Sequence, residues 1–398
     1  MFSTSFAYLV LVLAMAPLIY YLLVLYAGWS FFRQAKNKPR DPSFAPPVSI
    51  LKPVRGVDRE AFTNFASMCD LDYPEYEILF AVGDANDPVI EIIEQIQRAF
   101  PQRSIRMIVG VEQLGNCRKT NNLCRLAREA RHELLVINDA DVRVGKNYLR
   151  DVVEPLRDSN VGVVTALFRS LTDGGFAAEL DAVGVPADQS ASTLFAWKFF
   201  GLDFALGWTM AIPKQRLVEI GGFEALVDMH SDDFAVGNEV AKRGYRVELM
   251  RTPVEMVFPR ETFGQFFAHE LRWCTQLRNL RLSGYLGMFW TLGLAWCAIV
   301  LVVVPWWKIA AVYVASYVVL RFALAWTIAV WGLNDPTIVK KPWLVFLRDA
   351  INLGVYFTSF FSKTAEWRGV RYRLNGPYME RIDSDPPSGA AIARHRPV

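Results

Sequence analysis

Two kinds of hydrophobic pattern divide this chain of 398 residues. Long apolar stretches lie near the N-terminus and in the last third, and short apolar runs separated by helical periodicity fill the region between them. Phe6 to Phe32 contains no charged residue, and it exceeds the about 20 residues that a helix needs to cross a bilayer. Four basic residues follow within 33–40. We therefore predict a transmembrane anchor over 1–32 with its N-terminus outside, followed by a basic, Pro-rich linker over 33–47.

The region 48–260 alternates short β-like runs with amphipathic helical stretches, as is typical of a mostly parallel sheet covered by helices. The predicted strands are VSILKP, YEILFAV, IRMIVGV, ELLVIND and VGVVTAL, and the predicted helices are EAFTNFASMC, VIEIIEQIQRAF, KTNNLCRLAREA and NYLRDVVEPL. We predict an α/β catalytic domain over 48–260, whose ligands bind beyond the carboxyl ends of the strands. Within it, the aromatic stretch Ser192 to Ile212 fits either a loop at the lipid interface or a core helix and strand.

After residue 260 the pattern returns to membrane-type segments. The stretch 261–284, which contains HELRW, has the pattern of an interfacial amphipathic helix. The predicted C-terminal membrane helices occupy 285–361, where Leu286 to Val304 and Ile309 to Leu333 are apolar enough to span. The remainder, 362–398, is predicted to be a basic cytoplasmic tail that is partly disordered.

The final apolar segment, Trp343 to Phe361, contains Arg348, Asp349 and Asn352. If this segment crossed the bilayer, the basic residues of the tail would lie outside, against the positive-inside rule. We therefore predict that it is re-entrant or lies along the interface. The alternative is an ordinary span whose polar residues pack against the helix of Arg321.

Composition limits the function classes. A net charge of +3 does not call for nucleic acid, and the basic residues gather beside the apolar segments, as in membrane proteins. The five cysteines form no CxxC pair, which argues against a zinc site or a disulfide framework. We predict an integral membrane protein that binds no nucleic acid.

Acidic residues follow the predicted strands. Asp84 comes after ILFAVG, and Asp139 and Asp141 form a D-x-D directly after LLVIN. Hard oxygen ligands of this kind suit Mg²⁺ or Mn²⁺ bridging to phosphate oxygens. Asp232 and Asp233 open a helical stretch, where a carboxylate acts either as an N-cap or as the acceptor of a proton from an attacking hydroxyl. We expect these side chains to face a common cleft.

Basic and aromatic residues supply the other candidate contacts. Lys119 starts a predicted helix, which suits a nucleotide or phosphate contact, although an ordinary surface lysine would look the same. His269 and Arg272 share a helix face because they are three residues apart. Arg272 is suited to binding a diphosphate by paired hydrogen bonds, and Trp273 is the candidate wall of an acceptor pocket. The alternative for all three is a helix that only lies on the membrane surface.

The order Asp84, Asp139, Asp233 and a terminal R-W resembles the D, D, D, (Q/R)xxRW signature of membrane-bound GT-A glycosyltransferases. The segments SILKPVRGVD, KTNNL, INDADVRV, GGFEAL, SDDF, ELRW and WRGVRYRL resemble, in this order, segments of the ceramide glucosyltransferase family. This resemblance implies a GT-A fold for the α/β domain, a UDP-sugar donor and a divalent metal ion, Mg²⁺ or Mn²⁺. It also implies inversion at the anomeric carbon and a lipid hydroxyl as acceptor.

The resemblance implies donor contacts at Asp84, metal and diphosphate contacts at Asp139 with Asp141, and the base at Asp233. From the residue patterns described above, we add Lys119 and Arg272 as candidate donor contacts. The candidates for positioning the acceptor or the diphosphate are His269, Trp273 and Asp232. His269 stands where the signature has Gln or Arg, which is similar to bacterial glycosyltransferases that modify hopanoids.

We predict an inverting glycosyltransferase that moves a sugar, with glucose from UDP-glucose favoured, to the primary hydroxyl of a membrane lipid, with ceramide favoured. A hopanoid or diacylglycerol acceptor is the alternative. A processive polysaccharide synthase is disfavoured by the small number of membrane segments and by His269. A non-catalytic membrane scaffold is disfavoured by the complete acidic set. The predicted location is the bacterial inner membrane, with the catalytic domain in the cytoplasm.

Overall fold

The computed structural model describes residues 3–37, 41, 43–172, 174–258, 260–335, 337–367 and 369–382. The chain divides into an α/β unit, formed by 37–171, 201–259 and 364–398, and a helical unit, formed by 1–36, 172–200 and 260–363. The segment 172–200 therefore groups with the helices, although the sequence analysis placed it in the catalytic domain. The expected disorder at the end of the tail falls on 383–398, outside the described residues.

A seven-stranded sheet forms the core of the α/β unit. Its strands, in spatial order, are β3 (Ser104–Val109), β2 (Tyr76–Val82), β1 (Val48–Val54), β4 (Leu134–Asn138), β8 (Thr209–Pro213), β6 (Val161–Thr165) and β9 (Arg246–Leu249). Every pairing is parallel except those that β8 makes with β4 and β6. The mostly parallel α/β sheet predicted from the sequence is confirmed.

Helices follow the strands in the order that the hydrophobic pattern predicts. They are α2 (Ala61–Cys69), α3 (Val89–Ala99), α4 (Arg118–Glu129), α5 (Tyr148–Val153), the short turn η1 (Glu154–Arg157), α8 (Lys214–Glu219), η3 (Phe223–Leu226) and α9 (Asp232–Lys242). Strands β1, β2 and β4 are buried along their whole length because both faces of the sheet are covered. Asp84 follows β2 and Asp139 follows β4, so the strand ends expected for these residues are observed.

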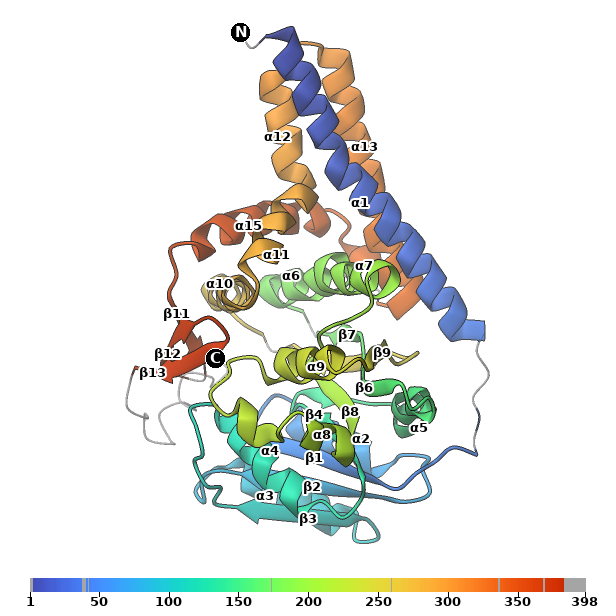
Figure 1. The fold of residues 1–398 in the computed structure, drawn as a ribbon, viewed down its shortest axis with the longest axis vertical. Coiled ribbons are helices and arrows are strands. Elements are labelled where there is room, and N and C mark those ends of the chain that lie inside the picture. Colours follow the sequence, from blue (N-terminus) through green and yellow to red (C-terminus); the bar gives the residue numbers. More distant parts are fainter. Residues whose placement is uncertain are drawn as a thin grey trace. The chain divides into compact units, whose positions relative to one another are not determined.

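Two smaller sheets complete the α/β unit. One contains β5 (Val142–Arg143), β10 (Val254–Val257) and β7 (Phe168–Leu171). The other is a C-terminal meander of β11 (Thr364–Trp367), β12 (Val370–Asn375) and β13 (Tyr378–Arg381), drawn in red in Figure 1. The buried residues of the meander pack around Cys117. The first part of the predicted tail is therefore an ordered sheet of the α/β unit.

The helical unit contains the apolar segments. Its elements are α1 (Thr4–Asn37), α6 (Phe176–Gly184), η2 (Val185–Gln189), α7 (Ser190–Phe199), α10 (Phe263–Leu280), α11 (Leu282–Gly287), η4 (Met288–Thr291), α12 (Gly293–Val303), α13 (Trp307–Ala325), η5 (Trp326–Leu333), α14 (Thr337–Lys340) and α15 (Leu344–Ser359). The aromatic stretch Ser192 to Ile212 is divided between α7 and β8, which matches the helix-and-strand alternative.

Among the described residues, two helices are long and apolar enough to cross a membrane: Thr4–Asn37 and the continuous segment Trp307–Leu333. A third crossing results if Leu282–Thr291 and Gly293–Val303, which meet at an angle of 57°, form one broken span. Figure 1 shows α1 running beside α12 and α13, and Tyr313 on α13 donates a hydrogen bond to the carbonyl of Ala14 on α1 (2.9 Å). Helix α15 is not among these candidates.

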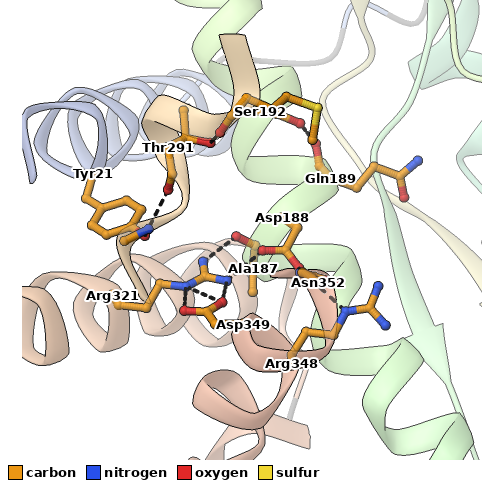
Figure 2. A network of polar contacts seen from close by, with 12 residues as sticks. Tyr21, Ala187, Asp188, Gln189, Ser192, Thr291, Arg321, Arg348, Asp349 and Asn352 are labelled. Carbon is orange, nitrogen blue, oxygen red and sulfur yellow. Dashed lines mark hydrogen bonds and ion pairs between the residues drawn. The ribbon is translucent and has the colours of Figure 1, made fainter. Parts of the chain in front are cut away.

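A buried ion-pair network joins α13 to α15 and η2 (Figure 2). Arg321 donates hydrogen bonds to Asp349 through its Nε and Nη2, and its Nη2 also donates to Asp188 (2.6 Å). Asn352 donates to the other carboxylate oxygen of Asp188 (2.8 Å). Arg348 continues the network to Glu270 on α10 (2.5 Å). The polar residues of the final apolar segment therefore pair with protein groups, as ionisable residues in apolar surroundings must.

Candidate active site

A cluster of carboxylates surrounds Lys119 in the α/β unit. Lys119 lies in the first turn of α4, and its Nζ is 2.8 Å from Oδ1 of Asp139, which follows β4. The same Nζ is 3.5 Å from Oδ2 of Asp232, which is close enough for an ion pair. This buried oxygen has no hydrogen-bond partner. Burial lowers the pKa of Lys119, whereas the neighbouring carboxylates raise it. Together the carboxylates have the larger effect, so the pKa is raised and this lysine is cationic at neutral pH.

Asp233 belongs to the same cluster, and its carboxyl has a raised pKa. Burial and the negative charge of Asp232 raise its pKa from the ordinary value to about 6. Gly207 makes room for this side chain, because a Cβ on Gly207 would lie 2.9 Å from Oδ2 of Asp233. A carboxyl with a pKa near neutrality is suited to taking up a proton from a hydroxyl.

The C-terminal meander supports the segment that leads into the two aspartates at the N-terminus of α9. The segment just before them bridges to the meander, where the N–H of Met379 donates to Asp228 (2.8 Å) and the N–H of His230 donates to Pro377 (3.1 Å). The buried ring of His230 also contacts the carbonyl of Gly376 (3.0 Å). The α4 side is tied to the same segment, because Asp228 accepts hydrogen bonds from the backbone and side chain of Asn116.

Asp139 is also contacted from inside the sheet. Lys52, in the middle of β1, donates to the side chain of Asn138 (2.6 Å) and to the carbonyl of Asp139 (2.9 Å). Burial lowers the pKa of Lys52 to about 8, and the charges of Asp139 and Asp141 oppose this shift. Asp141 continues the turn, and its carbonyl accepts a hydrogen bond from Val257 on β10 (3.2 Å).

The remaining candidate of the α/β unit is Asp84, in the turn after β2. Its Oδ1 accepts a hydrogen bond from the backbone N–H of Asn86 (2.9 Å). Lys119 thus pairs with Asp139 and Asp232, and the charge of Asp233 acts on the same lysine. Asp84 lies at the end of a different strand of the same sheet.

The three candidates of HELRW lie on α10 of the helical unit. This helix starts at a capping box, in which Thr262 and Gln265 exchange side-chain and backbone hydrogen bonds. His269 packs edge-on against Trp273 with ring centroids 4.7 Å apart, and its Nδ1 is 3.6 Å from Asp181. Arg272 donates to Gln276 one turn further along. The donor and acceptor roles predicted for these residues stay predictions.

Three features of the site were not predicted from the sequence. Lys52 lies inside a strand-like run, where the pattern indicated only its place in a strand. Gly207 and His230 carry no motif of their own, and their closeness to Asp233 and to the C-terminal meander arises from contacts between segments far apart in the chain. The alternation of apolar and polar residues in VRYRL was the one available signal for a strand near the C-terminus.

The fold and the placement of the acidic residues at strand ends define a GT-A glycosyltransferase domain joined to membrane-type helices. A likeness to the mannosyltransferase PcManGT from Pyrobaculum calidifontis, solved with GDP-Man and Mn²⁺, supports the fold: the TM-score is 0.51 at 19% identity, over 88% of this chain and 99% of that one. The profile of glycosyl transferase family 21 matches residues 9–377, so the chain belongs to this family.

Relatives with assigned activities carry the name that the resemblance predicted. Ceramide glucosyltransferase 3 of Caenorhabditis elegans is 23% identical over 256 residues, which are 64% of this chain and 55% of the relative. The ceramide glucosyltransferase of Komagataella phaffii is 31% identical over 157 residues, which are 37% of this chain and 31% of the relative. The chain therefore spans about half, or less, of the length of the curated relatives it matches.

Proposed function

We propose that this protein is an inverting glycosyltransferase that moves a hexose, with glucose from UDP-glucose favoured, to the primary hydroxyl of a membrane lipid, with ceramide favoured. The observation that carries the proposal is the cluster of Asp139, Asp232 and Asp233 around Lys119, in a chain of glycosyl transferase family 21. The names of the relatives support the sugar and the lipid.

Asp233 acts as the base in this proposal. Its carboxylate accepts the proton of the acceptor hydroxyl, while the hydroxyl oxygen forms a bond to the anomeric carbon of the donor sugar. The bond from that carbon to the diphosphate oxygen breaks on the opposite face, and UDP departs. The single displacement inverts the configuration. Lys119, held beside Asp139 and Asp232, is positioned to offset negative charge at the diphosphate.

The residues present fit a divalent cation, Mg²⁺ or Mn²⁺. Four carboxylates in this region (Asp139, Asp141, Asp232 and Asp233) face two ammonium groups, and one oxygen of Asp232 is buried without a hydrogen-bond partner. The described residues contain no preformed cluster of three or more ligands, so Asp139 and Asp141 would hold the ion together with donor phosphates. Such an ion supplies charge neutralisation for the departing diphosphate.

The proposed role of Asp233 is tested with Asp233→Asn in purified protein supplied with UDP-glucose and short-chain ceramide. We expect transfer to fall by at least about 10³-fold, while UDP binding stays within a few fold of wild type. Asp70→Asn, at an exposed carboxylate paired with Lys146, is the control. Near-normal turnover of Asp233→Asn would refute the assignment and make Asp232 the next candidate.

The acceptor is identified by lipid mass spectrometry after expression in a host that lacks glycosylated ceramides, hopanoids and diacylglycerols. A hexosylceramide that is absent with Asp233→Asn supports the proposal. If only a hexosylated hopanoid or diacylglycerol appears, that lipid and not ceramide is the acceptor, and the proposed glycosyl transfer still holds. A long polysaccharide product would contradict the single-transfer mechanism. We further propose a cytoplasmic catalytic unit in the bacterial inner membrane, as the basic residues after α1 indicate.

A further inference from the structure

Lys52 is among the largest side chains that are fully buried in the described structure, with 0% of its surface exposed. A charged side chain in the interior is costly unless it is hydrogen-bonded to partners that repay its lost hydration. An apolar residue would serve a strand of this sheet better if only packing mattered, and the other residues of β1 are buried as well. The partners of Lys52 therefore show what the lysine is for.

Those partners lie at the point where strand pairing between β1 and β4 stops. The register runs from Val48 opposite Leu134 to Leu51 opposite Ile137. Beyond it, the Nζ of Lys52 donates to Oδ1 of Asn138 (2.6 Å) and to the carbonyl of Asp139 (2.9 Å). The side chain of Lys52 thus continues the contact between the two strands beyond their backbone hydrogen bonds, and it fixes the last residue of β4 and the residue that follows it.

A second set of contacts supports the same strand end. The side chain of Asn138 donates to the hydroxyl of Tyr148 (3.4 Å), which contacts Thr209 on β8. Thr209 donates to the carbonyl of Ile137 (3.3 Å). Each of these buried groups is hydrogen-bonded, so the turn that begins at Asp139 rests on a satisfied polar network.

We propose that Lys52 is a positioning residue that holds the backbone of Asp139, so that the carboxylates of Asp139 and Asp141 face the donor diphosphate and its cation. Lys52 binds the carbonyl of Asp139 and not its carboxylate, which Lys119 contacts instead. The inference rests on the proposed function, because it assumes that the donor is bound at this turn.

The test is calorimetric binding of UDP to the purified full-length chain, with saturating Mn²⁺ and with a chelator. For Lys52→Met we expect metal-dependent UDP binding to weaken by at least tenfold and binding in chelator to stay within twofold of wild type. Lys146→Met is the matched control, since Lys146 is an exposed lysine paired with Asp70 at the surface. It should bind UDP like the wild type.

A double variant separates positioning from simple stability. In Lys52→Met with Asn138→Leu, both hydrogen-bonding partners are replaced by apolar groups, so the melting temperature should recover relative to Lys52→Met. If Lys52 positions Asp139, the loss of metal-dependent UDP binding persists in this variant. Recovery of UDP affinity together with stability would overturn the inference.

Three further outcomes are decisive. Tighter Mn²⁺ binding by Lys52→Met would show that Lys52 acts only through its repulsive charge, and it would overturn the positioning role. A wild-type protein that binds no UDP in Mn²⁺ would overturn the proposed function and, with it, this inference. Wild-type binding that Lys52→Met leaves unchanged would overturn the inference alone.

Discussion

At the Asp233 carboxyl, burial and the charge of Asp232 act in the same direction, and together they raise its pKa to about 6. Protonated Asp233 cannot take up the proton of the lipid hydroxyl, so we expect sugar transfer to fall as the pH drops through about 6. The measurement is the pH profile of kcat/KM. Asp232→Asn removes the neighbouring charge, so it should move this acid limb to lower pH. An acid limb that does not move would show that another group titrates.

The same shift has a consequence for stability. Because the folded-state pKa of Asp233 exceeds the ordinary value, the stabilising contribution of its proton is present below about pH 4 and is lost as the pH rises through about 6. Asp233→Asn should therefore unfold at a higher temperature than the wild type at pH 7.5, in a thermal melt. The gain is roughly 1–2 kcal/mol, reduced because the carboxyl is only partly buried.

Gly207 gives a second prediction at the residue scale. Gly207→Ala places a Cβ 2.9 Å from Oδ2 of Asp233, so the carboxylate must shift away from its position. We expect kcat to fall by about 10–100-fold, because the shifted carboxylate is no longer aligned with the hydroxyl it deprotonates. The KM for the donor should change little. Gly145→Ala is the control, since nothing lies within 4 Å of its added Cβ. Equal turnover in the two variants would contradict a fitted place for Asp233.

How far the sequence predicts the site depends on the range of the interactions. Asp84 and Asp139 were correctly placed at strand ends and Lys119 at a helix start, because each follows from the pattern of its own segment. The acidic residues were expected to face a common cleft, but the ion pairs of Lys119 with Asp139 and Asp232 were not predicted. The roles of Lys52 and Gly207 could not be predicted, since they depend on atoms brought close by tertiary packing.

At the scale of elements, the C-terminal meander is the largest departure from expectation. A basic tail was expected here, because the segment from WRGVRYRL onward is rich in arginine. Alternate residues of β12, however, are buried, and they cover Cys117, two residues before Lys119. Charged residues on one face and apolar residues on the other are what a half-buried strand requires. The strands β1, β2, β4 and β6 were predictable because their mostly apolar runs are buried along their whole length.

The meander is expected to support the site as well as the fold. Tyr372→Ala removes a buried ring from the cluster around Cys117, at a cost of about 3 kcal/mol, and it should lower turnover because α4 and α9 lose their common support. Arg373→Ala, at an exposed neighbouring position, should cost less than about 0.5 kcal/mol. Thermal unfolding and kcat are measured for both. Equal effects of the two variants would show that the meander does not support the site.

At the scale of the whole molecule, apolar segments alternate with a polar α/β unit, and hydropathy alone was sufficient to locate them. The helix Thr4–Asn37 and the segment Trp307–Leu333 coincide with predicted spans. Helix α12 is shorter than the predicted span, since a bend of 57° separates it from the preceding helices. Hydropathy could not show this bend, because it measures how apolar a segment is and not the direction of its backbone.

Topology can be tested with single cysteines in a variant that lacks the five native ones. Glu380→Cys, on the meander, should not react with an impermeant maleimide in intact cells but should react after permeabilisation. Lys308→Cys, at the start of α13, should react in intact cells, because the turn between α12 and α13 is expected outside. Labelling of Glu380→Cys in intact cells would contradict a cytoplasmic meander.

The meander also constrains how the chain is threaded through the bilayer. Residues 37–171 and 364–382 belong to one compact unit, so the chain must leave and re-enter the same aqueous compartment. Between these segments the number of crossings is therefore even, whatever the hydropathy of each helix. If α12 and α13 form one outward and one returning crossing, α15 cannot add a third. With an odd number of crossings, β12 and Cys117 would lie on opposite sides of the membrane and could not pack together. The packing of the last strands therefore requires an even number of crossings.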